Sequence, residues 1–174
     1  MAAVRSARVA VAVAAFAAGG CLSAVPIDTA PGIKVDSSLL GGWNCQAPLA
    51  EPETEKSELD ITAVDASRIL VEVTEPDQEP QHYEAYASSV AGSTLFNVMA
   101  AKGTLPLEPL EWVFVRATLS GNKLRIQTLN YDTPLKVASS AALRSLLESD
   151  SKKPGFFLDF ALCERKKGKK DAPQ

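Results

Sequence analysis

The sequence predicts a mainly β protein: an antiparallel up-and-down barrel of about eight strands, with one helix before the last strand. The first observation behind this prediction is that short runs of alternating apolar and polar residues recur along the chain, separated by turn signals. The second is that only one helical pattern is convincing, and it comes late. Short turns join nearly all the runs, so we expect a meander, which hides its edges best by closing into a barrel. With 174 residues, the chain is long enough for one domain with its own core.

The predicted strands occupy residues 39–45, 57–63, 68–75, 81–90, 94–101, 111–119, 123–130 and 156–165. The alternation is clearest in the second and third. Leu59 and Ile61 share one face of the second strand, and Ile69, Val71 and Val73 share one face of the third. Because successive side chains of a strand point to opposite faces, we expect these residues to lie inside the barrel.

Gly121-Asn122 gives the strongest local signal. Two central residues with glycine first favour a type II′ turn, which joins the strands 111–119 and 123–130 as a hairpin. The residues expected opposite one another on one face are Leu119 with Leu124, Ala117 with Ile126, and Val115 with Thr128. The pairs expected on the other face are Arg116 with Gln127 and Thr118 with Arg125.

The predicted helix follows this hairpin. Thr133-Pro134 is suited to a cap and first helical position, and Pro154-Gly155 ends the pattern. The apolar residues expected on one face of the helix are Val137, Ala141, Leu143, Leu146 and Leu147.

The N-terminal region is organised as a secretory signal. Residues 1–20 have two arginines without an acid, then an apolar run far shorter than the ~20 residues of a spanning helix, then Gly19-Gly20. Residues 21–37 contain Pro26, Pro31 and Gly32 without a period, and we expect a flexible tether there. The barrel domain is predicted at 38–165, and the basic residues of 166–174 are expected to form a disordered tail.

The segment Ala18-Gly19-Gly20-Cys21 resembles the lipobox of bacterial lipoproteins. The resemblance implies a lipid on Cys21, although the family prefers leucine where Ala18 stands. Two chains of a diacylglycerol and a third on the amine anchor a protein stably, whereas one chain does not. Leu22 follows the cysteine in place of aspartate, which in this family implies the outer membrane, facing the periplasm. The alternative is an ordinary cleavable signal.

If Cys21 is lipidated, Cys45 and Cys163 are the two cysteines left to form a disulfide. An oxidising compartment favours a disulfide between them, and the alternative is two free buried thiols. In a closed barrel of even strand number, the first and last strands are antiparallel neighbours. If Cys45 faces Cys163, the register places Trp43 directly opposite Arg165.

The stretch Leu40-Gly41-Gly42-Trp43 carries a second resemblance. A Gly-x-Trp motif in the first strand of an eight-stranded barrel, with a helix near the last strand, is similar to the lipocalin and calycin group, and to bacterial lipoproteins of this type. The resemblance implies an arginine packed over the indole, which we assign to Arg165, although the family's arginine is spaced differently. The alternative is that Arg165 simply begins the basic tail.

The last strand raises a conflict of faces. Phe156 and Phe160 lie on the face opposite Cys163, so they point outward if the disulfide points inward. We expect the helix to cover them on the outside, together with Trp112 and Phe114. The alternative is a β-bulge that swaps the faces.

No motif of catalysis is found. His82 is the sole histidine, with no partner residues that mark a triad, and it is expected on a half-exposed strand. Without a Cys/His cluster, a zinc site is not expected. We therefore predict no enzyme activity, no metal and no cofactor. The formal net charge of −3 argues against nucleic-acid binding.

Two functions remain. The first is a binding module whose lumen takes a small apolar or amphipathic ligand, as the lipocalin resemblance implies. The residues expected to line this lumen are Tyr83, Met99, Phe157 and Asp159. The second is a protein–protein module, either an inhibitor of a secreted hydrolase or a structural component of the envelope. Its candidate contact is the loop at 103–107.

Overall fold

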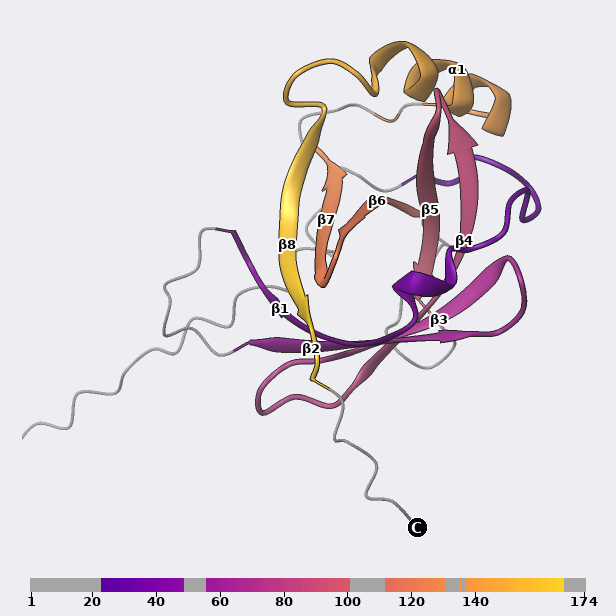
Figure 1. The fold of residues 1–174 in the computed structure, drawn as a ribbon. Helices are drawn as coiled ribbons and strands as arrows, with labels where there is room; N and C mark the ends of the chain where they lie inside the picture. Colours follow the sequence, from indigo (N-terminus) through magenta and orange to yellow (C-terminus); the bar gives the residue numbers. More distant parts are fainter. Residues whose placement is uncertain (1–22, 49–55, 101–111, 131–134, 136, 168–174) are drawn as a thin grey trace, which may run out of the picture.

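The structure is a computed structural model that describes residues 23–48, 56–100, 112–130, 135 and 137–167. The eight strands form one closed barrel in which each strand pairs with the next and the last with the first. All eight pairings are antiparallel. The strands are β1 (Gly41–Gln46), β2 (Ser57–Ala63), β3 (Arg68–Thr74), β4 (Gln81–Val90), β5 (Ser93–Ala100), β6 (Val113–Ser120), β7 (Lys123–Leu129) and β8 (Phe157–Arg165). The predicted fold is confirmed (Figure 1).

The β6–β7 hairpin has the predicted register. Leu119 pairs with Leu124, Ala117 with Ile126 and Val115 with Thr128. Gly121 has a φ of 60°, as the first central residue of a type II′ turn requires. The turn residues therefore predict which residues of β6 and β7 lie opposite one another.

The seam between β1 and β8 also has the predicted register. Cys45 lies opposite Cys163, and Trp43 lies opposite Arg165. The two cysteines form a disulfide with a Cα–Cα distance of 4.0 Å across a sequence separation of 118 residues. One covalent bond thus joins the first strand to the last where the barrel closes.

Strand β8 contains an irregularity that corrects the expected faces. Ala161 pairs with Ile126 and Asp159 with the next residue, Gln127, so Phe160 is the extra residue of a bulge. We expected Phe160 on the outside, covered by the helix, but it lines the lumen. The bulge resolves the conflict because it reverses the faces of the strand on its two sides.

The helix α1 (Ser140–Asp150) begins later than predicted, at Ser140 and not after Thr133-Pro134. Ser139 caps it, since its side chain accepts a hydrogen bond from Ala142 N at 3.2 Å. The helix lies at one end of the barrel in Figure 1, over the tips of β4 and β5. Among the described residues, no helix is long and apolar enough to cross a membrane.

Two apolar clusters form the core. The first lines the interior of the barrel. The second lies between α1 and the strands, where the helix residues Leu143 and Leu147 are fully buried. It includes Phe114 and Phe156, with Trp112 packed against it, so the helix does cover these three aromatic side chains as expected.

The segment at 23–37 does not form the flexible tether that we expected. Ser23 and Trp112 exchange two backbone hydrogen bonds, of 3.0 and 2.8 Å. Ile27 is 1% exposed, and its N–H donates to Asn97 Oδ1 at 2.7 Å. Asp28 forms an ion pair of 2.6 Å with Arg144 of the helix. Apolar and hydrogen-bonding side chains therefore bind this segment to the outside of the barrel despite its prolines.

The disordered tail was predicted to begin at residue 166, but Lys166 is still bonded to the barrel. Lys166 N donates to Gly42 O at 2.9 Å, and Lys166 Nζ lies 2.8 Å from a carboxylate oxygen of Glu58. This lysine extends the seam with β1. Residues 168–174 lie outside the described part of the chain.

Candidate functional site

The interior of the barrel contains a cavity of about 140 Å³. Apolar side chains from β1 to β8 form nearly all of its wall. They include residues of the predicted inward faces of β2 and β3, which are Leu59, Ile61, Ile69, Val71 and Val73. They also include residues from one face of the β6–β7 hairpin, which are Val115, Ala117, Leu124 and Ile126. The alternation read from the sequence thus predicted the apolar lining that β2 and β3 supply.

At one end of the cavity lies Leu39 of a short 3₁₀ helix, η2 (Ser37–Leu39), which packs in the same apolar cluster as Trp43. The indole is fully buried and donates from Nε1 to Leu39 O at 3.0 Å. The Arg165 guanidinium lies over it, 4.1 Å from the ring centroid, and donates to Leu40 O at 2.9 Å and to Ser38 O. The packing of Arg165 on Trp43 that the resemblance implied is therefore present.

Gly41 makes this packing sterically feasible. Its φ is +106°, in the region that side chains other than glycine rarely adopt. A Cβ at this position would lie 3.2 Å from Arg165 Nη1. Glycine is thus needed here both for the backbone conformation and for the approach of the guanidinium.

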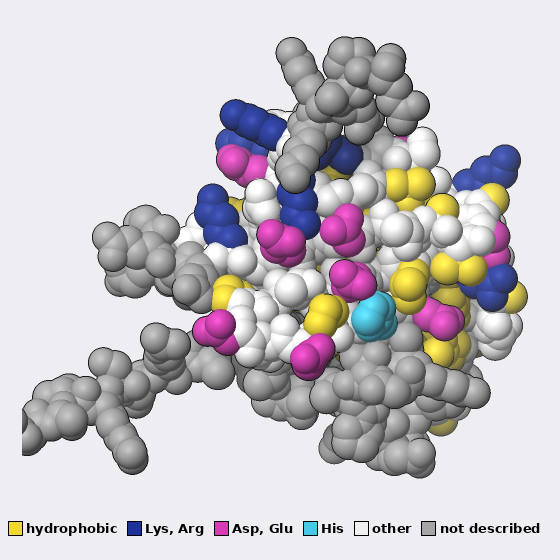
Figure 2. All heavy atoms as spheres, turned by 90° about the horizontal axis from the view of Figure 1, so that it is seen from below, with side chains coloured by type: hydrophobic (Ala, Val, Ile, Leu, Met, Phe, Trp, Pro, Cys, Tyr) yellow, Lys and Arg dark blue, Asp and Glu magenta, His cyan; other side chains and the backbone are white. Residues whose placement is uncertain are grey.

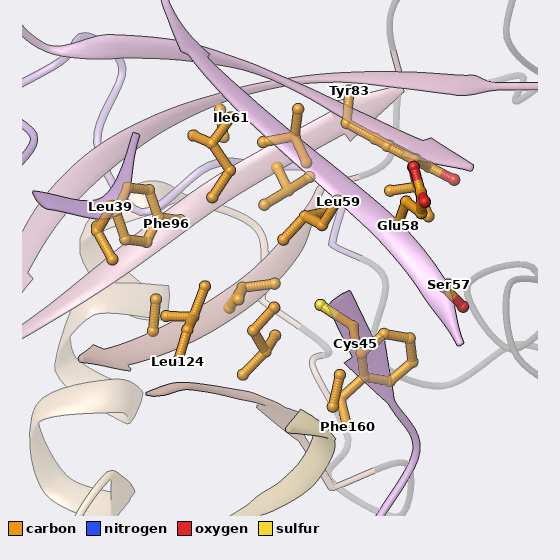
Figure 3. A pocket seen from close by; sticks show the side chains of 18 of the residues that line it. Leu39, Cys45, Ser57, Glu58, Leu59, Ile61, Tyr83, Phe96, Leu124 and Phe160 are labelled. Atoms are coloured by element: carbon orange, nitrogen blue, oxygen red, sulfur yellow. The ribbon is translucent and has the colours of Figure 1, made fainter. Parts of the chain in front are cut away.

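Polar side chains gather at the other end of the cavity. Figure 3 shows Ser57, Glu58 and Tyr83 at one end of the lining, and Leu39, Phe96 and Leu124 at the other. The remaining polar residues of the lining are Gln46 and Glu75. A molecule in this cavity would therefore have its apolar part among the aliphatic side chains and a polar part near these groups.

Glu75 is the acid that the structure buries in this region, with 8% of its surface exposed. Gln78 Nε2 donates to its Oε2 at 2.7 Å. Its other oxygen, Oε1, is buried and has no hydrogen-bond partner among the described residues. Burial, together with the negative charge of Glu75, raises the pKa of Tyr83 to about 12.

Only one of the four predicted lining residues is found in the cavity wall. Tyr83 does line the cavity, but Met99, Phe157 and Asp159 are not among its lining residues. Met99 follows Val98, which lines the lumen, so it lies on the opposite face of β5. Phe157 and Asp159 precede the bulge at Phe160, and it is this bulge that turns them outward.

Outside the barrel, Phe157 and Asp159 contact arginines. The guanidinium of Arg116 lies 4.2 Å from the centroid of the Phe157 ring. Asp159 accepts two hydrogen bonds from Arg125, of 2.7 and 2.8 Å, and one from Gln127 at 2.8 Å. The hydrogen bonds from Arg125 are the main cause that lowers the pKa of Asp159. These two residues therefore stabilise the outer face of β6–β8.

Sequence reasoning missed Glu75, although a signal was present. Ile69, Val71 and Val73 were assigned inward, and Glu75 continues the same alternation by two residues. An acid on the inward face of a strand was therefore readable from the spacing.

No family model, curated protein or solved structure matches this chain.

The described residues contain no group of three or more His, Cys, Asp or Glu side chains that could hold a metal ion. His82 lies on the outer surface, where its Nε2 is 2.9 Å from Glu72 Oε2. Figure 2 shows this histidine among scattered acidic side chains on one face of the barrel. The expectation of a half-exposed histidine is confirmed, since 42% of its side chain is exposed.

Proposed function

We propose that this protein is a non-catalytic binding barrel of the bacterial cell envelope whose lumen takes a small apolar or amphipathic molecule. The observation that carries the proposal is the cavity itself, with apolar walls, Leu39 at one end and polar groups at the other. Such a combination of apolar lining and a few convergent polar groups is typical of small-molecule sites.

The volume of the cavity limits the ligand. About 140 Å³ is below the ~300–1,000 Å³ of pockets for drug-sized ligands. It is close to the ~150 Å³ of an engineered apolar cavity that binds benzene. Ile69, Val71, Leu124 and Ile126 line the cavity and narrow it. The ligand is therefore a small one, with an apolar part about the size of a benzene ring.

A lumen-filling variant tests this proposal. Ala85 is 3% exposed and lines the cavity, so Ala85→Leu places added methyl groups where the ligand would lie. Ala142→Leu adds the same group at an exposed position of the helix and is the matched control. We expect benzene and hexanol to raise the melting temperature of the wild type and of Ala142→Leu, but not that of Ala85→Leu. Equal responses of all three proteins would contradict the proposal. Mild extraction of the protein from its native host, with no co-purifying small molecule, would also contradict the proposal.

The envelope location and the membrane as a partner rest on the signal at 1–20 and on the lipobox-like segment ending in Cys21. Only Leu22 separates Cys21 from Ser23, which is hydrogen-bonded to Trp112. A lipid on Cys21 would thus hold the barrel directly at the surface of the bilayer, in our proposal the outer membrane on its periplasmic side.

Membrane fractionation tests the anchor. Cys21→Ser is expected to move the protein from the membrane fraction to the soluble fraction. A double Cys45→Ser, Cys163→Ser variant keeps the anchor and should stay in the membrane fraction. Membrane association of Cys21→Ser would exclude the lipid anchor.

The alternative is a protein–protein module. Its candidate contact, the loop at 103–107, lies outside the described residues. Leu158 and Leu162 of β8 are 37% and 49% exposed, which offers apolar contact area on the last strand. Inhibition of a secreted hydrolase, together with no ligand in the lumen, would favour this alternative.

A further inference from the structure

One oxygen atom at the lumen lacks a partner. Glu75 Oε1 is the buried side-chain atom that finds no hydrogen bond in the described part of the chain. Glu75 is more than nine-tenths buried, with 8% exposure, and it belongs to the lining of the cavity. Buried polar atoms are nearly always paired in folded proteins, so an unpaired carboxylate oxygen calls for a physical explanation.

The neighbouring groups do not satisfy this oxygen. The amide of Gln78 donates to the other oxygen, Oε2. The Tyr83 hydroxyl donates its hydrogen to Gln81 Oε1 at 2.6 Å. The described lining residues include no Lys, Arg or His. The other acid of this lining, Glu58, is paired with Lys166 Nζ at 2.8 Å, so the buried carboxylate oxygen left without a partner among the described residues is Glu75 Oε1.

We propose that the lumen binds a small amphipathic molecule that carries a protonated amine, with its ammonium group on Glu75 Oε1 and its apolar part inside the barrel. This inference rests on the proposed function, ligand binding in the lumen, and names the ligand class. An ionised carboxylate only accepts hydrogen bonds, and its bonds to a cationic donor are about twice as strong as those between neutral groups. The cavity of about 140 Å³ restricts the apolar part to a short alkyl chain or one ring.

Three probes of equal chain length separate the head groups: hexylamine, hexanol and hexanoate. Calorimetric titration of the mature protein should give the tightest binding for hexylamine and the weakest for hexanoate. Glu75→Gln keeps the shape of the side chain and removes its charge. This variant should bind hexylamine with roughly tenfold or more lower affinity, because a charge-assisted hydrogen bond contributes on this scale. Its affinity for hexanol should stay within about twofold, and this binding also shows that the variant is folded.

Two further variants complete the design. Glu84→Gln changes an exposed acid of β4 and should leave all three affinities unchanged. Glu75→Asp keeps the charge but withdraws it by one methylene, so hexylamine should bind with intermediate affinity. It also provides a second measurement if Glu75→Gln does not fold.

The outcomes distinguish the two proposals. Hexylamine and hexanol binding equally well, or hexylamine binding unchanged in Glu75→Gln, would overturn the assignment of the ammonium group and leave lumen binding in place. Absence of binding for hexylamine, hexanol and benzene alike would overturn both.

Discussion

The guanidinium of Arg165 lies 4.1 Å from the centre of the Trp43 ring, across the seam between the last strand and the first. It also donates to the backbone oxygens of Leu40 and Ser38. The same side chain therefore holds the indole, the first strand and the 3₁₀ helix together. This contact lies beside Leu39, at the end of the cavity opposite Tyr83.

We predict that Arg165→Ala lowers the free energy of unfolding by about 2 kcal/mol, from the cation–π contact and the charge-assisted hydrogen bonds. Arg165→Lys keeps the charge but loses the planar guanidinium group, so it should lower the free energy of unfolding by about half as much. Urea denaturation measures both values. Arg68→Ala is the control, since Arg68 forms an exposed ion pair with Asp65 that contributes little. An effect of Arg165→Ala no larger than that of Arg68→Ala would disprove the role of this contact.

The Cys45–Cys163 disulfide is expected to contribute strongly to stability. It spans a sequence separation of 118 residues, for which the chain-entropy model gives about 5 kcal/mol. A double Cys45→Ala, Cys163→Ala variant should unfold at much lower urea concentration than the wild type. Reductant should destabilise the wild type and have no effect on the variant. Equal stability of the two oxidised proteins would contradict the prediction.

Stability should fall in acid partly because of Asp159. Hydrogen bonds from Arg125 hold the pKa of Asp159 below its ordinary value. A carboxyl group with a lowered folded-state pKa contributes stability that is present above the unfolded pKa of about 3.9, and this contribution is lost as pH falls through the folded pKa. Asp159→Asn should thus be less stable than the wild type at pH 6, and the difference should shrink below pH 4. Urea unfolding across this range measures it, with Glu84→Gln as a surface control. A difference that stays constant with pH would refute the assignment.

Stability should also fall in strong alkali because of two tyrosines. Burial raises the pKa of Tyr83 to about 12, helped by Glu75, and burial raises that of Tyr86 to about 12, helped by Asp28. A tyrosine with a raised pKa contributes stability that is present below the unfolded value of about 10 and is lost as pH rises from there towards 12. Tyrosinate absorbance against pH measures these titrations.

The same titration tests the proximity of Glu75 to Tyr83. Glu75→Gln removes one cause of the raised pKa, so Tyr83 should titrate at lower pH, while Tyr86 should not move. Tyr83→Phe and Tyr86→Phe variants assign the two transitions. A titration of Tyr83 that is unchanged in Glu75→Gln would show that the carboxylate does not act on it.

The failures of sequence reasoning have local physical causes. Asp159 and Phe157 were assigned inward because a strict two-residue period was continued through β8, and the bulge at Phe160 broke that period. A flexible tether was predicted at 21–37 from its prolines. The fold supplies partners for it, such as Asn97 and Arg144, that are far away in the sequence.

The sequence by itself determined the barrel, the β6–β7 register, the disulfide and the pairing of Trp43 with Arg165, because alternation and turn chemistry are local and barrel closure fixes the last neighbour. Only the tertiary structure decided the size of the cavity and which acid is buried beside it. Cavity volume depends on how side chains from eight strands fill one shared space, and the missing partner of Glu75 depends on where Gln78 and Tyr83 direct their hydrogens. Neither is a property of any single stretch of chain.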